Sequence, residues 1–268
     1  MPDVSDTITY SVEAGIGTVT INRPEKLNAF NSGMLLCIRQ VLDLAEQDDA
    51  VRVVVLIGAG RSFSSGQDLT AVLPNDDSGR PNLARTLEQD YSPLILRLSH
   101  YPKITLAALN GPAVGAAANI ALACDIVVAA RSSYLQQAFV RIALVPDVGG
   151  TWLLPRILGP KLALALALTG DRVMAEEAKA MGLVYRVFDD ADFSTSVRNF
   201  AASFVAGPAM AYRLIKQAFG RSPENDLETQ LMLEAELQGE AGRTDDFLEA
   251  IKAFAEKRPP VFGLRRNK

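Results

Sequence analysis

VRVVVLIGAG, residues 51–60, is a short run of apolar and mostly β-branched residues that two glycines close. Such a run is typical of a strand in a parallel sheet whose two faces are both covered. ITLAALN (104–110) and CDIVVAA (124–130) repeat the pattern, and the sequence between these stretches has helical periodicity. Strands that alternate with helices predict an α/β protein with right-handed crossovers.

The flanking sequence extends this alternation in both directions. TVTINRP (18–24) alternates like a strand that Pro24 ends, and residues 31–49 predict a helix that Asn31 or Ser32 could cap. Helices are also expected over 92–101 and 114–123. From about residue 190 the pattern becomes almost continuously helical, with apolar stripes over 209–219 and 227–237. We therefore predict a core over residues 1–205 and a helical oligomerisation region over 206–268.

Composition limits the class of protein. The chain has 268 residues and a net charge of -4, so it lacks the overall basic surface that attracts nucleic acid or anionic lipid. The acidic start does not read as a signal peptide, and the apolar runs are too short for a membrane span, so we expect a cytoplasmic protein. Cys37 and Cys124 are expected to be buried thiols. His100 is the only histidine, which argues against serine-triad chemistry and zinc, and no metal is predicted.

Two glycine-containing turns are candidate binding loops. GAGRSFSSGQDL (58–69) follows the apolar strand, but its glycines do not have dinucleotide-binding spacing. NGPAVGAAANIALACD (110–125) places a turn before small residues that open a helix with free N–H groups. Both can be tight strand-to-helix turns, or their N–H groups can converge to form an oxyanion hole.

A single acid, Asp147, stands in the apolar stretch LVPDVGGTWLLPR (144–156). If a helix begins at Pro146, this carboxylate lies in the first turn and is stabilised by the helix dipole. Alternatively, an acid among apolar residues marks a reactive site. The stretch alone leaves both interpretations open.

Five motifs in order, NRPEKLNAF, GAGRSFSSGQDL, NGPAVGAAANIALACD, VPDVGGTWLLPR and FAEKRPPVF, resemble the enoyl-CoA hydratase/isomerase (crotonase) superfamily. The resemblance covers nearly the whole chain. It implies a spiral of ββα units with C-terminal helices that form a homotrimer or hexamer. Within the superfamily, the motifs are most similar to the isomerases that convert a ring epoxide of phenylacetyl-CoA to an oxepin.

The resemblance also implies an acyl-CoA site. The thioester oxygen would lie between the backbone N–H groups of Gln67 and Ala116, and Asp147 would be the working carboxylate. Coenzyme A arrives as part of the substrate, so no separate cofactor is implied. The resemblance places eight residues near the nucleotide end of coenzyme A: Arg23, Lys26, Ala29, Ser65, Asp68, Leu69, Phe254 and Lys257. Phe254 and Lys257 would come from the C-terminal tail of this or a neighbouring subunit. The alternative without a ligand is that Arg23 and Lys26 belong to a solvated loop and that Phe254 packs in the core.

Departures from the hydratase pattern indicate the reaction. Hydratases of this superfamily use two glutamates, and the matching substrate-binding positions here are Asn119 and Phe139, which take up no proton at neutral pH. Asp147 remains, and one carboxylate suits a proton shift between two carbons. Tyr91, Leu144 and Trp152 are further candidates for the acyl pocket, although a core would contain the same residues.

An acyl-CoA isomerase is therefore the favoured function, with the ring epoxide as its substrate. One alternative is a Δ3,Δ2-enoyl-CoA isomerase or weak hydratase of fatty-acid oxidation, which would share the same machinery. A dehalogenase, with Asp147 as nucleophile, ranks third. A non-enzymatic alternative is an RNA-binding or scaffold relative; the helix predicted over 31–49 has one Arg and no Lys, which argues against RNA binding.

Overall fold

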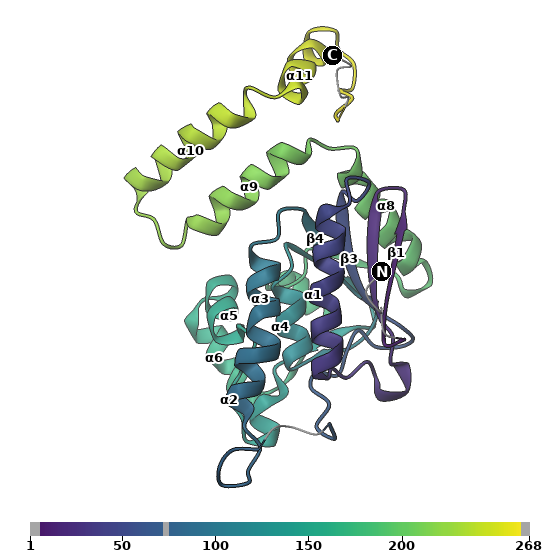
Figure 1. Cartoon of the computed structure of the whole chain (residues 1–268), viewed down its shortest axis with the longest axis vertical. Coiled ribbons are helices and arrows are strands. Elements are labelled where there is room, and N and C mark those ends of the chain that lie inside the picture. Colours follow the sequence, from purple (N-terminus) through teal and green to yellow (C-terminus); the bar gives the residue numbers. More distant parts are fainter. Residues whose placement is uncertain (1–5, 72–74, 264–268) are drawn as a thin grey trace.

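A computed structural model describes residues 6–71 and 75–263 of the chain (Figure 1). Within those residues the main sheet has the strand order β1-β2-β3-β4-β6-β9. Its strands are β1 (Ile8–Glu13), β2 (Ile16–Ile21), β3 (Val53–Gly58), β4 (Ile104–Leu109), β6 (Ile126–Ala130) and β9 (Arg186–Phe188). Neighbouring strands pair in parallel except in the β1–β2 hairpin. The α/β class is therefore confirmed.

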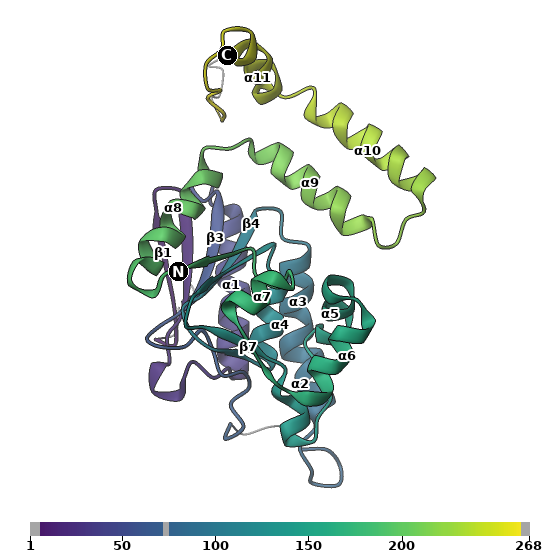
Figure 2. The same cartoon turned by 180° about the vertical axis from the view of Figure 1, so that it is seen from behind.

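Both faces of this sheet are covered, as the apolar strands predict. Val54 and Leu56 of β3 belong to a core shared with α1 (Ser32–Gln47), α3 (Ser92–Ser99) and α4 (Ala116–Leu122). Val53 and Val55 point the other way, into a second core closed by α8 (Phe193–Val205). Figures 1 and 2 show these helices on opposite sides of the sheet. The alternation of side chains along a strand explains why every position of β3 is apolar.

A smaller sheet lies beside the candidate site, because Val114 of its first strand lines the pocket. Its order is β5-β7-β8, formed by Ala113–Val114, Tyr134–Gln136 and Arg172–Met174. The helices around it are α5 (Gly150–Leu158), α6 (Pro160–Thr169) and α7 (Ala175–Ala180). A short helix α2 (Leu83–Thr86) and a π-helix (Leu87–Tyr91) precede α3, and 3₁₀ helices cover Pro24–Lys26, Ala138–Ile142 and Asp190–Asp192.

The local predictions from sequence differ from the structure mainly at edges. The first helix begins at Ser32, and its cap is Asn31, whose side chain accepts a hydrogen bond from the N–H of Met34 at 3.0 Å. Strand β1 was not predicted, because it is an edge strand with mostly exposed side chains and no apolar run. The strand predicted over 18–24 starts two residues earlier, at Ile16.

Helices α9 (Ala209–Arg221), α10 (Leu227–Ala241) and α11 (Asp245–Ala255) extend away from the body (Figure 2). Lys216 ties α9 to the body, because its Nζ lies 2.8 Å from the carbonyl oxygen of Lys103 and 2.6 Å from Asp125 Oδ2. The division at residue 205 into core and oligomerisation region stays a prediction. No helix in the described part of the chain is long and apolar enough to cross a bilayer, and the acidic start, residues 1–5, lies outside that part.

Candidate active site

A pocket of about 220 Å³ lies between four segments that are far apart in the sequence. The segments are the loop after β3, the α2 and π-helical region, the turn from β5 into α4, and the 3₁₀ helix with the loop that follows it. Its lining is mostly apolar, as in many ligand sites. Its predicted members are Ser65, Gln67, Leu69, Tyr91, Ala116, Phe139, Leu144 and Asp147.

The two glycine-containing turns meet at this pocket. A β-bridge joins them, with hydrogen bonds of 3.1 Å from the Ser64 N–H to the Pro112 carbonyl and from the Val114 N–H to the Ser64 carbonyl. Gly66 has φ +91°, and a Cβ atom there would lie 2.7 Å from the Val114 carbonyl oxygen. Only glycine therefore permits this approach.

The approach brings two backbone donors to the pocket wall. Gln67 follows Gly66, and Ala116 is the first residue of α4. Across residues 6–71 and 75–263, neither N–H group has a protein acceptor in the hydrogen-bond network. Two free N–H groups that point to one oxygen atom would stabilise a negative charge on it.

Asp147 does not lie in a helix. Helix α5 begins at Gly150, so the interpretation with Pro146 at the helix start is wrong. A tight turn intervenes, in which Val148 and Gly149 have φ of +51° and +78°, and the Gly150 N–H donates to the Asp147 carbonyl at 2.8 Å. Positive φ is strained for a β-branched residue such as Val148, and such strain is concentrated at functional sites.

The Asp147 carboxylate is the only one among the described residues that line the pocket. Its Oδ1 atom is buried without a hydrogen-bond partner within the described structure. Burial raises the pKa of Asp147 to about 6, against a weaker opposite effect of its own N–H group. The carboxylate is therefore mostly ionised at neutral pH, its Oδ1 has no partner among the described residues, and its pKa is close to the value that suits a general base.

Asn119 holds the Asp147 turn from behind. Its Nδ2 donates to the Asp147 carbonyl at 2.8 Å, and its Oδ1 accepts from Gln137 Nε2 at 2.8 Å. A Cβ atom on Gly150 would lie 2.4 Å from Asn119 Nδ2, so the contact requires glycine there. Asn119 is fully buried and is not part of the pocket lining. Its predicted contact with substrate stays a prediction, whereas its hydrogen bond to the Asp147 carbonyl points to a positioning role.

The aromatic candidates divide between the pocket and the surface. The Phe139 ring stands near the oxyanion turn, 3.8 Å from a Cβ atom built on Gly115. Tyr91 and Leu144 also line the pocket. Trp152 does not, which corrects its prediction: half exposed on α5, its ring is 3.9 Å from the Arg156 guanidinium. The sequence indicated aromatic residues but not the direction of each side chain.

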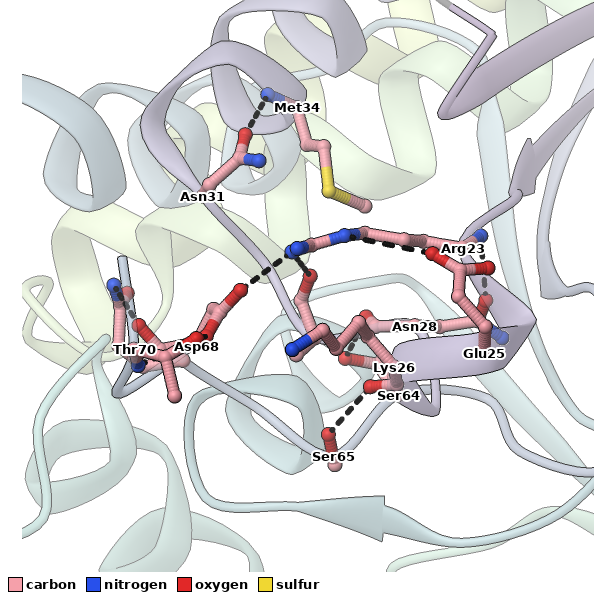
Figure 3. A network of polar contacts seen from close by, with 12 residues as sticks. Arg23, Glu25, Lys26, Asn28, Asn31, Met34, Ser64, Ser65, Asp68 and Thr70 are labelled. Carbon is pink, nitrogen blue, oxygen red and sulfur yellow. Dashed lines mark hydrogen bonds and ion pairs between the residues drawn. The ribbon is translucent and has the colours of Figure 1, made fainter. Parts of the chain in front are cut away.

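The loop before α1 carries three of the predicted nucleotide contacts, namely Arg23, Lys26 and Ala29, and Figure 3 shows the first two beside Ser65 and Asp68. Arg23 Nη1 lies 2.7 Å from Asp68 Oδ2 and 3.3 Å from the Ala29 carbonyl oxygen. Hydrogen bonds from the Thr70 side chain and from Arg23 lower the pKa of Asp68 to about 2. Asp68 thus fixes Arg23, and its predicted place near the nucleotide stays a prediction.

Asn28 shapes this loop, although the sequence analysis did not single it out. Leu27 and Asn28 have φ of +50° and +60°. The buried Asn28 side chain accepts from the Arg23 N–H at 2.9 Å and donates to the carbonyls of Ala59 and Ser62 at 2.8 and 2.7 Å. The available signal was an asparagine in a turn, since asparagine tolerates positive φ.

The tail residues are not brought to this loop. Phe254 is 87% exposed on α11, at the opposite end of the molecule from the loop before α1 (Figure 1). Lys257 follows the same helix. Within one chain these two residues do not reach the pocket, so only a neighbouring subunit could supply them.

The described residues contain no cluster of three or more His, Cys, Asp or Glu side chains that could hold a metal ion. Cys37 and Cys124 are buried free thiols, as predicted. The pocket therefore combines one carboxylate, two residues with free backbone N–H groups and a mostly apolar wall that also carries the side chains of Tyr91, Gln67 and Arg141.

A parallel main sheet, a smaller sheet and C-terminal helices, with a mostly apolar pocket where two glycine-containing turns meet, are features of the crotonase class, whose members act on acyl-CoA thioesters. The chain belongs to the enoyl-CoA hydratase/isomerase family, whose profile matches residues 11–265. It is 43% identical to the 1,2-epoxyphenylacetyl-CoA isomerase of Escherichia coli K12, over 94% of this chain and 96% of that protein. It is 44% identical to a probable enoyl-CoA hydratase of Rhodobacter capsulatus, over 96% and 97%.

Solved structures agree with this assignment. A putative enoyl-CoA hydratase/isomerase from Mycobacterium abscessus superposes with a TM-score of 0.88 at 32% identity, over 96% of this chain and all of that one. The predicted crotonase fold is therefore confirmed.

Proposed function

We propose that this chain is an acyl-CoA isomerase in which Asp147 carries a proton between two carbons of the acyl group. The observation that carries the proposal is the ionised Asp147 carboxylate with its partnerless Oδ1, because this residue lines the same pocket as Gln67 and Ala116, whose N–H groups are free. Asn119 and Phe139 stand where hydratases of the family have glutamates. They supply no second carboxylate to activate water.

The proton shift follows from this arrangement. Asp147 removes a proton from the acyl α-carbon, and the electron pair moves onto the thioester oxygen, which the two N–H groups stabilise. The protonated Asp147 then returns the proton to the γ-carbon as the carbonyl re-forms. The product is the positional isomer, with no atoms gained or lost, and Asp147 is again a carboxylate.

The substrate is proposed to be 1,2-epoxyphenylacetyl-CoA, which is converted to oxepin-CoA in phenylacetate degradation. The 43% identity to an isomerase of that name supports this, as do the aromatic side chains of Tyr91 and Phe139 on the pocket wall. In that reaction, the α-proton moves onto the ring as it opens to the seven-membered oxepin. A generic Δ3,Δ2-enoyl-CoA isomerase would use the same carboxylate and N–H groups.

The nucleotide end of the thioester is proposed to bind near the loop before α1. Ser65 and Leu69 line the pocket, and the Ser65 Oγ lies 3.4 Å from the Lys26 carbonyl oxygen. Arg23, held by Asp68, and Lys26 bring positive charge to this side, and Ala29 supports Arg23 through its carbonyl. Phe254 and Lys257 would come from a neighbouring subunit of a homotrimer or hexamer.

The reaction class can be tested by offering the wild-type enzyme 3-hexenoyl-CoA and crotonyl-CoA in parallel. We expect isomerisation of the first to exceed hydration of the second by about 10²-fold or more, as one missing acid–base group costs about that factor. Hydration as fast as isomerisation would contradict the proposal. Chromatography of 1,2-epoxyphenylacetyl-CoA then separates the two isomerases, because a generic isomerase leaves the epoxide unchanged.

A further inference from the structure

Tyr91 places a buried hydroxyl group on the pocket wall. The residue is 2% exposed, and its hydroxyl donates a short hydrogen bond to Gln67 Oε1. Both side chains line the pocket. A phenylalanine would supply the same aromatic wall without the cost of removing a hydroxyl group from water. The hydroxyl group of Tyr91 therefore calls for a role that the ring alone does not fill.

An irregular helix directs this side chain. Tyr91 is the last residue of the π-helix Leu87–Tyr91, and the Ser92 N–H bonds the Leu87 carbonyl five residues earlier. Pro93 follows and has no N–H to continue the α-helical pattern to the Gln89 carbonyl. The widened turn is a feature that recurs at functional sites.

The phenol remains a donor throughout the working pH range. Burial raises the pKa of Tyr91 above its ordinary value, and the nearby carboxylates of Asp147 and Asp90 raise it further. A neutral O–H donor and the ionised Asp147 therefore face the same cavity. The acceptor that Tyr91 uses, Gln67 Oε1, is a neutral amide on the wall of that cavity, so a substrate oxygen can take its place.

We propose that the Tyr91 hydroxyl donates a hydrogen bond to an oxygen atom of the acyl group. The pocket would then favour acyl groups that carry an ether-type oxygen beside the reacting carbons over hydrocarbon acyl groups of the same shape. This inference rests on the proposed function and specifies its substrate class: the ring oxygen of an epoxide or of an oxepin is such an acceptor. The oxyanion N–H groups and Asp147 keep the roles given above.

The test uses two ligands of equal size, (2-methoxyphenyl)acetyl-CoA and (2-ethylphenyl)acetyl-CoA, which differ in one oxygen and one CH₂ group. Calorimetry with the wild-type enzyme should give about ten-fold tighter binding of the methoxy compound, the worth of one net hydrogen bond. In Tyr91→Phe the preference should fall below about two-fold. A merely structural role of Tyr91 would weaken both ligands alike and leave their ratio unchanged.

A second variant guards against a misfolded Tyr91→Phe. Gln67→Met keeps the backbone N–H but removes the competing acceptor, so the methoxy preference should increase. Equal binding of the two ligands by the wild type, or a preference that survives in Tyr91→Phe, would overturn the inference while leaving the proposed function intact. Binding of neither thioester would overturn both.

Discussion

Asp147 is the proposed base, and its surroundings are unfavourable for a carboxylate. Oδ1 is buried without a partner, and Val148 beside it has a strained backbone. A stabilising carboxylate would have hydrogen bonds or a cation, as Asp68 has with Thr70 and Arg23. Because Oδ1 has no partner, its lone pairs are free for the proposed proton transfer, at the expense of stability.

The titration of Asp147 gives a prediction for activity. Because its pKa is raised to about 6, kcat/KM for isomerisation should rise as the pH increases through about 6 and level off above it. A carboxylate with the ordinary value of 3.8 would already be fully active at pH 5. Initial rates from pH 4.5 to 8, with stability checked at each pH, measure the profile. A flat profile would contradict the assignment.

The raised pKa of Asp147 also makes the stability of the folded protein depend on pH. The folded-state pKa lies above the unfolded value, so the folded protein binds more protons between pH 4 and 6. The contribution of this group to stability is therefore complete below pH 4 and is lost as the pH rises through about 6. Allowing for partial exposure, Asp147→Asn should be more stable than wild type at pH 7 by about 1–2 kcal/mol. Near pH 4 the difference should vanish.

Helix α4 contains two residues of the proposed site, Ala116 and Asn119. Its first residue, Ala116, carries one of the two proposed oxyanion N–H groups, and Asn119, one turn later, donates a hydrogen bond to the Asp147 carbonyl at 2.8 Å. The register of this one helix thus fixes the proposed base relative to the proposed oxyanion hole. Interior packing makes such an arrangement rigid, which suits a proton transfer that depends on distance.

Replacing Asn119 by alanine should therefore reduce turnover. The change leaves Gln137 Nε2 without its acceptor and removes a donor from the Asp147 carbonyl, at a cost in stability of about 1–3 kcal/mol. We expect kcat to fall about ten-fold or more through misplacement of the base, with KM nearly unchanged. Steady-state kinetics and thermal melts measure both effects. The exposed Asn199→Ala is a control, and an unchanged kcat in Asn119→Ala would remove the positioning role.

Strands and helices with a regular pattern of apolar residues were predictable from the sequence. The backbone conformation of the turns between them was not. The buried strands β3, β4 and β6 and the long helices have apolar patterns that their environments require. The start of α5 was misplaced because Pro146 imitates a helix start, while two successive positive φ angles, at Val148 and Gly149, delay it. Such angles depend on contacts with distant segments, here the Asn119 hydrogen bond, and no short stretch of sequence encodes them.

At the scale of the whole molecule, the C-terminal helices expose much apolar surface. Phe219, Leu227 and Met232 are 75%, 75% and 70% exposed, and α9 to α11 extend away from the core. A monomer rarely leaves such a surface in water. The same helices carry Phe254 away from its own pocket. Both facts support an assembly in which one subunit completes the site of another.

Sedimentation equilibrium tests the assembly. The wild type should have three or six times the 28.8 kDa mass of one chain. Met232→Glu should shift the distribution toward monomer, because an uncompensated charge in an apolar interface costs several kcal/mol. Glu236→Gln, on an exposed position of the same helix, is the control. A monomeric wild type would contradict the proposed trimer or hexamer.

The sequence predicted part of the pocket lining but not the contacts between the lining residues. Gln67, Ala116 and Asp147 were identified from motifs, and all three line the pocket. The link between Tyr91 and Gln67 was not predicted, because it joins a π-helix to a loop 24 residues away. The opposite placement of the tail could not be predicted from one chain either, since helix patterns do not specify how α9 to α11 are oriented relative to the core.

The most direct test of the central claim is deuterium incorporation from D₂O into 3-hexenoyl-CoA and its product, measured by mass spectrometry for the wild type and Asp147→Asn. The account predicts that the wild type isomerises the substrate and exchanges its α-proton, whereas the Asn variant binds the thioester with similar affinity but loses about 10²-fold or more of both activities. A variant that keeps both isomerisation and exchange would show that Asp147 is not the base.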